Sequence, residues 1–204
     1  PDGGPSSKIA GWLTGISDNA DFYLDLRSGD LYEDLTPFVY FPGNASEDVV
    51  AQAMTAASVL DMPYMVRSTA STGAYNSAAL RGVPSLLLER GAAGDCLRED
   101  VDMYKKDVLN VLKHLGVLKG DLEPARNTPV EIGPVIYLES KHDAMWQSEV
   151  QTGQRVKAGQ ILGRVLDQFG GVIEEYRAEM DGVLLYQLYT LSTNKGDVLS
   201  AYGA

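Results

Sequence analysis

The first 118 residues alternate short apolar runs with stretches of helical periodicity. Apolar runs of strand length occur at residues 21–26, 37–41, 64–67 and 84–88. Between them, apolar positions recur every three or four residues over 46–60 and 98–115, as on a helix that buries one face. Ser6 can cap a further helix that runs to Ile16, and 76–81 is predicted to form one helical turn. This alternation predicts an α/β fold, a sheet with helices on both faces.

The pattern changes after residue 120. Gly120, Pro124 and Pro129 interrupt a polar run, and helical periodicity is absent beyond Val130. Short β-rich segments follow between glycines, at residues 135–138, 156–165, 172–176, 182–189 and 198–202. We therefore expect two domains, an α/β domain over residues 1–120 and a small all-β domain over residues 129–204.

Two segments of the C-terminal region echo each other. Residues 152–162 and 193–199 share a glycine, a polar residue and a valine in the same order. The repeat resembles the barrels of biotinyl and lipoyl carriers. A carrier needs a lysine at the tip of its central hairpin, but Ala178-Glu179-Met180-Asp181-Gly182 has none there. We expect a barrel-sandwich module without a prosthetic group.

The composition of the chain limits which partners it can bind and which cellular compartment it fits. The formal charge of -11 argues against a nucleic-acid groove or an anionic membrane surface, which select clustered Lys and Arg. No apolar run approaches the ~20 residues that span a bilayer. The single cysteine, Cys96, excludes an intrachain disulfide and fits a reducing cytoplasm. We expect a cytoplasmic protein with no nucleic-acid or membrane partner, and the oligomeric state stays open, a homo-oligomer included.

Glu89 is the first catalytic candidate. It follows directly after the apolar run Pro84–Leu88, so its carboxylate is expected at the carboxyl end of a buried strand. In open α/β sheets, ligands and reacting groups gather at that edge. The alternative is an ordinary solvated glutamate in a loop.

Two other side chains are candidates for substrate binding. Tyr75 lies in a Ser-, Thr- and Gly-rich stretch over 68–76 that is predicted to be a surface loop, from which its hydroxyl could reach a substrate. It could equally pack against its own loop. Arg67, at a strand end, could bind a substrate carboxylate in bidentate fashion or serve as a surface ion-pair partner.

Three motifs, taken in order, resemble the succinylglutamate desuccinylase/aspartoacylase family. They are Asp25-Leu26-x-Ser28-Gly29-Asp30, then Gly82-Val83-Pro84-Ser85-Leu86-Leu87-Leu88-Glu89-x-Gly91, then Gly153-Gln154-x-Val156-Lys157-x-Gly159-Gln160. The resemblance implies a zinc-carboxypeptidase-like fold. It also implies zinc-dependent hydrolysis of an N-acyl amino acid or a related small amide.

The family's zinc site is carried over only where residues match. The resemblance implies a His-x-x-Glu pair near the amino end, a further histidine in an Asp-Leu-His setting, and a glutamate in the later motif as general base. Glu89 matches that glutamate. The His-x-x-Glu segment is expected upstream of Pro1, and Arg27 stands where the histidine is expected. Because a guanidinium has no lone pair to donate, we expect this chain alone to bind no catalytic zinc.

Arg27 is expected at the same sheet edge as Glu89. There it could pair with Glu89 or Asp30 and bind substrate, or it could be an exposed arginine on a loop. Two functions follow. One is a deacylase whose upstream segment supplies the metal ligands, and the other is a degenerate relative that keeps the fold as a binding or assembly domain.

Overall fold

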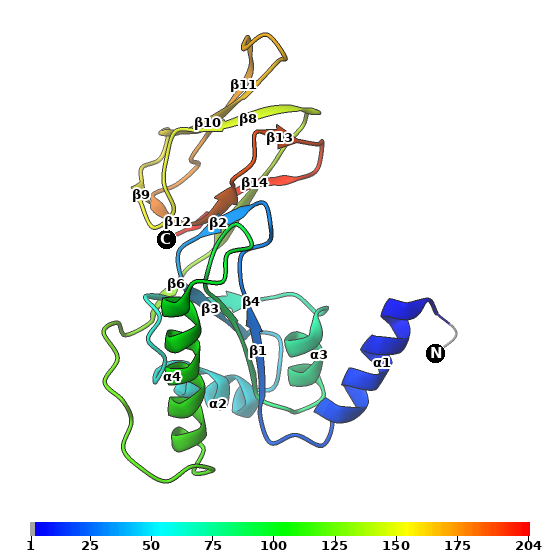
Figure 1. The fold of residues 1–204 in the computed structure, drawn as a ribbon, viewed down its shortest axis with the longest axis vertical. Coiled ribbons are helices and arrows are strands. Elements are labelled where there is room, and N and C mark those ends of the chain that lie inside the picture. Colours follow the sequence, from blue (N-terminus) through cyan, green and yellow to red (C-terminus); the bar gives the residue numbers. More distant parts are fainter. Residues whose placement is uncertain (1–2) are drawn as a thin grey trace. The chain divides into compact units, whose positions relative to one another are not determined.

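The computed structural model describes residues 3–204, which form four α-helices and three β-sheets (Figure 1). The helices are α1 (Pro5–Ser17), α2 (Glu47–Ala57), α3 (Ala74–Leu80) and α4 (Arg98–His114). The strands are β1 (Tyr23–Arg27), β2 (Glu33–Leu35), β3 (Phe38–Pro42), β4 (Tyr64–Ser68), β5 (Ser85–Glu89), β6 (Val130–Ile132), β7 (Val135–Glu139), β8 (Ala144–Ser148), β9 (Arg155–Val156), β10 (Ile161–Leu166), β11 (Val172–Arg177), β12 (Gly182–Leu188), β13 (Ser192–Thr193) and β14 (Val198–Gly203). The mixed α/β class predicted from the sequence is confirmed.

The described chain divides into two compact units. The first contains residues 3–27, 38–88 and 101–131, and the second contains residues 28–37, 89–100 and 132–204. Both units are therefore assembled from discontinuous segments. The linear domain limits of 1–120 and 129–204 stay a prediction.

The first unit is built on a five-stranded sheet in the order β1-β5-β3-β4-β6. β3 and β4 run parallel, with Phe38 opposite Tyr64 and Pro42 opposite Ser68. On one face of this sheet, residues of β3 and β5 pack against α2 and α4. The core there consists of Val39, Phe41, Ala53, Ala56, Ala57, Leu60, Met62, Leu86, Leu88 and Val111.

Helix α3 covers the opposite face of the sheet. Its Tyr75 ring stacks on Tyr40 with 6.5 Å between the centroids. The Ser85 hydroxyl donates to the Tyr75 carbonyl oxygen at 2.7 Å. Because successive strand residues point to opposite faces, Tyr40 and Ser85 lie on the face away from the α2 and α4 core. Helices on both faces of the sheet, as predicted, are confirmed.

Helix α4 is where the sequence predicts it, but its buried face differs from the predicted apolar stripe. The buried residues of α4 are Asp107, Asn110 and Val111. Asp107 Oδ1 accepts the Asp61 N–H at 2.7 Å, and Asn110 Nδ2 donates to the Val59 carbonyl at 3.2 Å. Polar side chains of α4 therefore form hydrogen bonds with backbone groups of the segment that follows α2. A pattern of hydrophobic residues does not reveal such hydrogen bonds.

Residues 119–128 form neither helix nor strand, yet side chains of the first unit hold them. Asn110 Nδ2 donates to the Glu123 carbonyl at 2.9 Å, and the Glu123 N–H donates back to Asn110 Oδ1 at 2.8 Å. The Asn127 N–H donates to Asp61 Oδ1 at 3.0 Å. This segment is therefore attached to the first unit and is no free linker.

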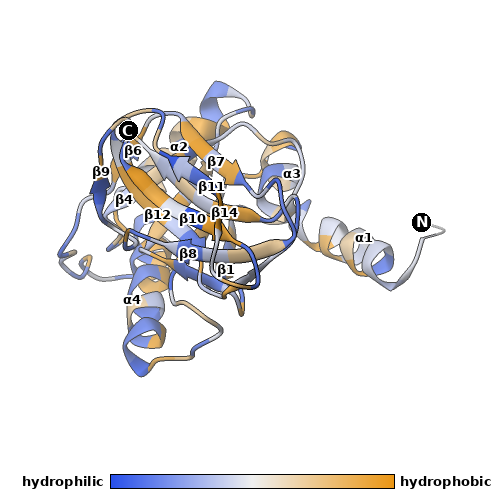
Figure 2. Ribbon diagram, turned by 90° about the horizontal axis from the view of Figure 1, so that it is seen from above, coloured by the Kyte–Doolittle hydropathy of each residue, from blue (hydrophilic) through white to orange (hydrophobic). Residues whose placement is uncertain are grey.

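The second unit contains two β-sheets. One has the order β11-β10-β8-β13, and the other has the order β2-β12-β14-β7, with β9 paired to β12. β12 is hydrophobic along much of its length (Figure 2), with Val183, Leu184 and Leu185 buried. β2 joins this unit by antiparallel pairing, with Leu35 opposite Tyr186. The β-rich character predicted for the C-terminal region is confirmed, and the barrel-sandwich arrangement stays a prediction.

Candidate functional site

Glu89 is the last residue of β5, as predicted. The four residues before it are buried, whereas Glu89 itself is partly exposed. After it, the chain turns through Gly91, whose φ of 90° lies in the left-handed region that favours glycine. A buried strand thus delivers a single carboxylate to its carboxyl end.

Backbone hydrogen bonds tie the turn after Glu89 to the segment before β2. The Gly29 N–H donates to the Gly91 carbonyl at 3.0 Å, and the Ala93 N–H donates to the Glu33 carbonyl at 2.8 Å. A Cβ on Gly29 would lie 2.8 Å from the Glu33 carbonyl oxygen and 3.1 Å from that of Gly91. These close approaches fix the two segments against each other within the second unit.

The charge of Glu89 contributes to the pKa of Tyr186, a residue of β12. Burial raises the pKa of Tyr186, and the charges of Tyr137, Glu33 and Glu89 raise it further. The Tyr137 and Tyr186 rings lie 6.3 Å apart between centroids. Burial and the neighbouring negative charges therefore both favour the protonated form of the Tyr186 phenol.

Sequence reasoning missed Tyr186, Tyr137 and Glu33. They come from β12, β7 and β2, which lie far apart in the sequence and meet only through the pairing of the second unit's strands. Nothing in the local pattern around Tyr186 distinguishes it from the tyrosines that only pack. Strand pairing was the information needed.

Arg27 ends β1 and makes a bidentate ion pair with Asp25. Its Nε and one terminal nitrogen donate to the two Asp25 carboxylate oxygens at 3.0 and 2.9 Å. The Arg27 side chain is 48% exposed, whereas that of Asp25 is 14% exposed. The predicted pairing with Glu89 or Asp30, and a contact with substrate, stay predictions.

The donor set of this chain does not fit the zinc that the family resemblance implies. Among residues 3–204, no three His, Cys, Asp or Glu side chains gather where they could hold a metal ion. A guanidinium bonded to a carboxylate occupies the position where a histidine was expected, and it cannot coordinate a cation. His142, one of the chain's two histidines, instead lies 3.0 Å from Glu174 Oε2.

Arg67 has two contacts that explain its position without a substrate. Its Nε lies 3.1 Å from Glu131 Oε1, and both side chains are partly exposed. Its guanidinium carbon lies 4.8 Å from the centroid of the Phe41 ring, in cation–π geometry. These are the contacts of the ion-pair alternative, and binding of a substrate carboxylate stays a prediction.

Tyr75 lies in α3 and is only 6% exposed. The loop predicted over 68–76 ends earlier, because Gly73, with φ of 90°, caps a helix that begins at Ala74. The ring packs on Tyr40, so it fills the space between α3 and the sheet. A role of its hydroxyl in substrate binding stays a prediction.

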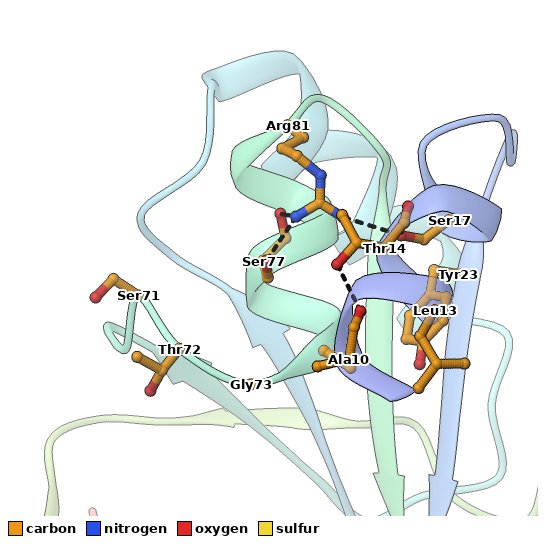
Figure 3. A pocket seen from close by; sticks show the side chains of 11 residues that line it. Ala10, Leu13, Thr14, Ser17, Tyr23, Ser71, Thr72, Gly73, Ser77 and Arg81 are labelled. Atoms are coloured by element: carbon orange, nitrogen blue, oxygen red, sulfur yellow. Dashed lines mark hydrogen bonds between the residues drawn. The ribbon is translucent and has the colours of Figure 1, made fainter. Parts of the chain in front are cut away.

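A pocket of about 380 Å³ lies between α1 and α3 in the first unit (Figure 3). Its polar lining comes from Thr14, Ser17, Tyr23, Ser71, Thr72, Ser77 and Arg81. Arg81 donates to the Ser77 carbonyl at 2.7 Å and to Ser17 Oγ at 2.9 Å, and it pairs with Asp18. The lining includes no carboxylate and no histidine, so the pocket has no general base of its own.

Three known proteins are similar to nearly all of this chain. It is 28% identical over 209 residues to the N-alpha-acetyl-L-2,4-diaminobutyric acid deacetylase of Halomonas elongata. This alignment covers 98% of the chain and 61% of the deacetylase. A succinylglutamate desuccinylase from Silicibacter sp. TM1040 is 27% identical, with a TM-score of 0.86 over 100% of the chain and 64% of that protein. The product-bound ectoine utilization protein EutE (DoeB) of Ruegeria pomeroyi is 26% identical, with a TM-score of 0.87. The match covers 100% of this chain and 64% of EutE.

No family model matches the chain. The chain spans a little under two thirds of the length of these relatives. No helix among residues 3–204 combines the length and apolar character that crossing a bilayer requires.

The sheet covered by helices, the β-rich unit and the carboxylate that ends β5 define a mixed α/β protein of the kind these relatives represent. Within that class, the chain is similar over its whole length to a protein described as a succinylglutamate desuccinylase. The resemblance to the succinylglutamate desuccinylase/aspartoacylase family, predicted from the order of three motifs, is confirmed.

Proposed function

We propose that the protein containing this chain hydrolyses N-acyl amino acids or related small amides, with Glu89 as general base. The observation that carries the proposal is the position of Glu89, which ends a buried strand and contributes to the raised pKa of Tyr186. The names of the relatives support the reaction class. They include a diaminobutyric acid deacetylase and a succinylglutamate desuccinylase.

Glu89 and Tyr186 have complementary roles in this proposal. Glu89 takes a proton from water as the water oxygen attacks the amide carbonyl carbon. Tyr186, kept protonated by its surroundings, donates a hydrogen bond to the carbonyl oxygen as negative charge develops there. The carbon–nitrogen bond then breaks, and protonated Glu89 gives the proton it took from water to the leaving amine nitrogen, which returns Glu89 to its carboxylate form. The products are a carboxylic acid and an amine.

The proposal assigns no step to a metal on these residues. Zinc is the family's expected cofactor, but the described side chains offer no ligand group for it. Arg27, bonded to Asp25, contributes a fixed positive charge and no coordinating atom. What this chain supplies is the base, the phenol and the scaffold that holds them.

Replacing Tyr186 by Phe tests the role of the phenol. Tyr186→Phe keeps the ring next to Tyr137 but removes the donor, so kcat on N-acetyl-2,4-diaminobutyrate or N-succinylglutamate should fall by about a hundredfold. The matched control is Tyr189→Phe, because Tyr189 is 67% exposed. The assay is amine release by the protein that contains this chain. Equal rates for the wild type and Tyr186→Phe would exclude the proposed role of Tyr186.

A second function, a binding or assembly domain without hydrolysis, is favoured by one observation. The Asp25–Arg27 ion pair occupies the sheet edge where the family resemblance placed a metal ligand. If this function is correct, no amide of the two substrate types is hydrolysed, and the variant Arg27→His does not restore hydrolysis. Turnover by the unaltered protein would exclude it.

A further inference from the structure

The side chain of Tyr104 joins the carboxyl ends of two neighbouring strands. Its hydroxyl donates to the Leu88 carbonyl of β5 at 3.0 Å, and it also donates to the Arg27 carbonyl of β1. β1 and β5 are adjacent in the five-stranded sheet. Because a phenol has one proton, the two carbonyl oxygens share it in a three-centre hydrogen bond. One side chain of α4 thus ties the ends of β1 and β5 together.

The Tyr104 hydroxyl is held in place by packing and by other hydrogen bonds of α4. The ring packs against the core of the first unit, which includes the fully buried Leu88. Further along α4, Asp107 Oδ1 accepts the Asp61 N–H at 2.7 Å, and Lys106 Nζ lies 2.8 Å from Asp61 Oδ2. These contacts fix the helix against the segment that follows α2 without using the phenol. The hydroxyl is therefore a rigid reference point for the strand ends.

The hydrogen bond to Leu88 acts on the peptide unit that precedes the Glu89 side chain. The Leu88 carbonyl and the Glu89 N–H belong to one planar peptide unit, so a bond that fixes the carbonyl also orients the backbone of Glu89. Beyond Glu89, the Gly91 carbonyl accepts the Gly29 N–H at 3.0 Å. The backbone is thus restrained on both sides of this partly exposed carboxylate.

We propose that Tyr104 is a positioning residue for Glu89. Its hydrogen bond orients the peptide unit from which Glu89 projects, and so holds the carboxylate where it can take a proton from water. This inference rests on the proposed function, in which Glu89 is the general base. In this role the phenol touches no reacting atom. Its effect on the rate arises because a base must lie within hydrogen-bond distance of the proton that it removes.

Tyr104→Phe tests the role, because it removes the hydroxyl and keeps the ring in the core. In the protein that contains this chain, kcat for amine release from N-acetyl-2,4-diaminobutyrate or N-succinylglutamate should fall by about tenfold or more. KM should stay within about twofold, because the phenol does not contact the substrate. Replacing Tyr104 by 4-aminophenylalanine returns an N–H donor to the same place on the ring and should restore most of kcat.

The matched control is Val111→Ala in the same helix. Val111 is 1% exposed in the same core, so its truncation should lower the free energy of unfolding at least as much as the loss of one hydroxyl does. It should leave kcat and KM unchanged. Urea unfolding measures the stability of both variants. An equal fall in kcat in both variants, or a fall that 4-aminophenylalanine does not reverse, overturns the positioning role, because Tyr104 would then only stabilise the fold.

Failure of this inference can be told apart from failure of the proposed function. If Glu89→Gln loses turnover while Tyr104→Phe keeps the kcat of the unaltered protein, the positioning role is wrong and Glu89 remains the base. If the unaltered protein releases no amine, or if Glu89→Gln keeps the unaltered rate, the proposed function and the positioning role are both wrong.

Discussion

Asp61 is a buried carboxylate that joins three parts of the first unit. It follows α2, its Oδ2 lies 2.8 Å from Lys106 Nζ of α4, and its Oδ1 accepts two bonds from Asn127. Burial on its own would raise the pKa of Asp61. The bonds from Lys106, from the Arg126 and Asn127 backbones and from the Asn127 side chain outweigh it and lower the pKa to about 2.

The lowered pKa predicts how stability depends on pH. The folded chain holds Asp61 ionised more strongly than the unfolded chain, whose pKa is near 3.8, so the carboxylate contributes stability above pH 4. The contribution, about 2 kcal/mol, is lost as the pH falls from about 4 to about 2. In urea unfolding, Asp61→Asn should therefore be less stable than the wild type at pH 7, and the gap should close by pH 2.

The exposed Asp121→Asn, in the same segment, is the matched control and should change stability by less than about 0.5 kcal/mol at pH 7. A gap between the wild type and Asp61→Asn that is the same at pH 7 and pH 2 would show that ionisation of Asp61 is not what stabilises the fold.

Sequence reasoning could find Glu89 but not its neighbours. Glu89 follows an apolar run that is long enough to be a strand, so its place at the strand end was predictable. Tyr186 was not, because its significance depends on Glu33 and Glu89, which are distant in sequence. For Arg27, one property was predictable from the sequence and another was not. Its inability to bind a metal follows from its chemistry alone, whereas its bond to Asp25 required the structure.

At the scale of elements, β10 depends on the absence of a side chain at Gly163. A Cβ there would lie 2.3 Å from Trp146 Cη2 and 2.6 Å from the Gln147 carbonyl oxygen. The indole belongs to β8 and packs edge-on against Tyr176 in a core cluster of the second unit. Gly163 therefore makes room for the largest side chain of that cluster.

Gly163→Ala should destabilise the second unit by about 1–3 kcal/mol, because neither the backbone nor the packed indole can move away freely. Trp146 fluorescence reports the change in a Trp12→Phe background, since Trp12 is 67% exposed.

The control for this substitution is Gly15→Ala. Gly15 lies in α1 with no atom within 4 Å of its Cβ position, so alanine there should stabilise slightly, by about 0.5–1 kcal/mol. Equal unfolding midpoints for the wild type and Gly163→Ala would mean that Trp146 does not pack over Gly163.

The elements themselves were largely predictable, and their buried faces less so. α2 begins after Ser46, whose hydroxyl accepts the Val49 N–H, with Glu47 and Asp48 in its first turn. Local capping chemistry suffices for that prediction. The spacing of apolar residues was enough to predict helix α4. It did not predict that Asp107 and Asn110 are buried, because they form hydrogen bonds with backbone groups that are distant in sequence. Nothing in the sequence next to Asp107 and Asn110 indicates these hydrogen bonds.

At the scale of the whole molecule, the order of motifs carried more information than any single motif. The resemblance to the succinylglutamate desuccinylase/aspartoacylase family was predictable because the Asp25, Glu89 and Gly153 motifs occur in order along one chain. The discontinuous make-up of the two units was not predictable. β2 lies in the part of the sequence that was predicted to form the α/β domain, yet it pairs with β12 of the second unit. The alternation of apolar and polar residues in a strand therefore does not decide which sheet the strand joins.

The central claim is that Glu89 is the base of an amide hydrolase. The most direct test is kcat for amine release from N-acetyl-2,4-diaminobutyrate and N-succinylglutamate by the protein that contains this chain, with Glu89→Gln. The control is Glu139→Gln, which also changes the last residue of a strand. We predict wild-type turnover in the control and a loss of about a hundredfold or more in Glu89→Gln. Wild-type turnover in Glu89→Gln would contradict the claim.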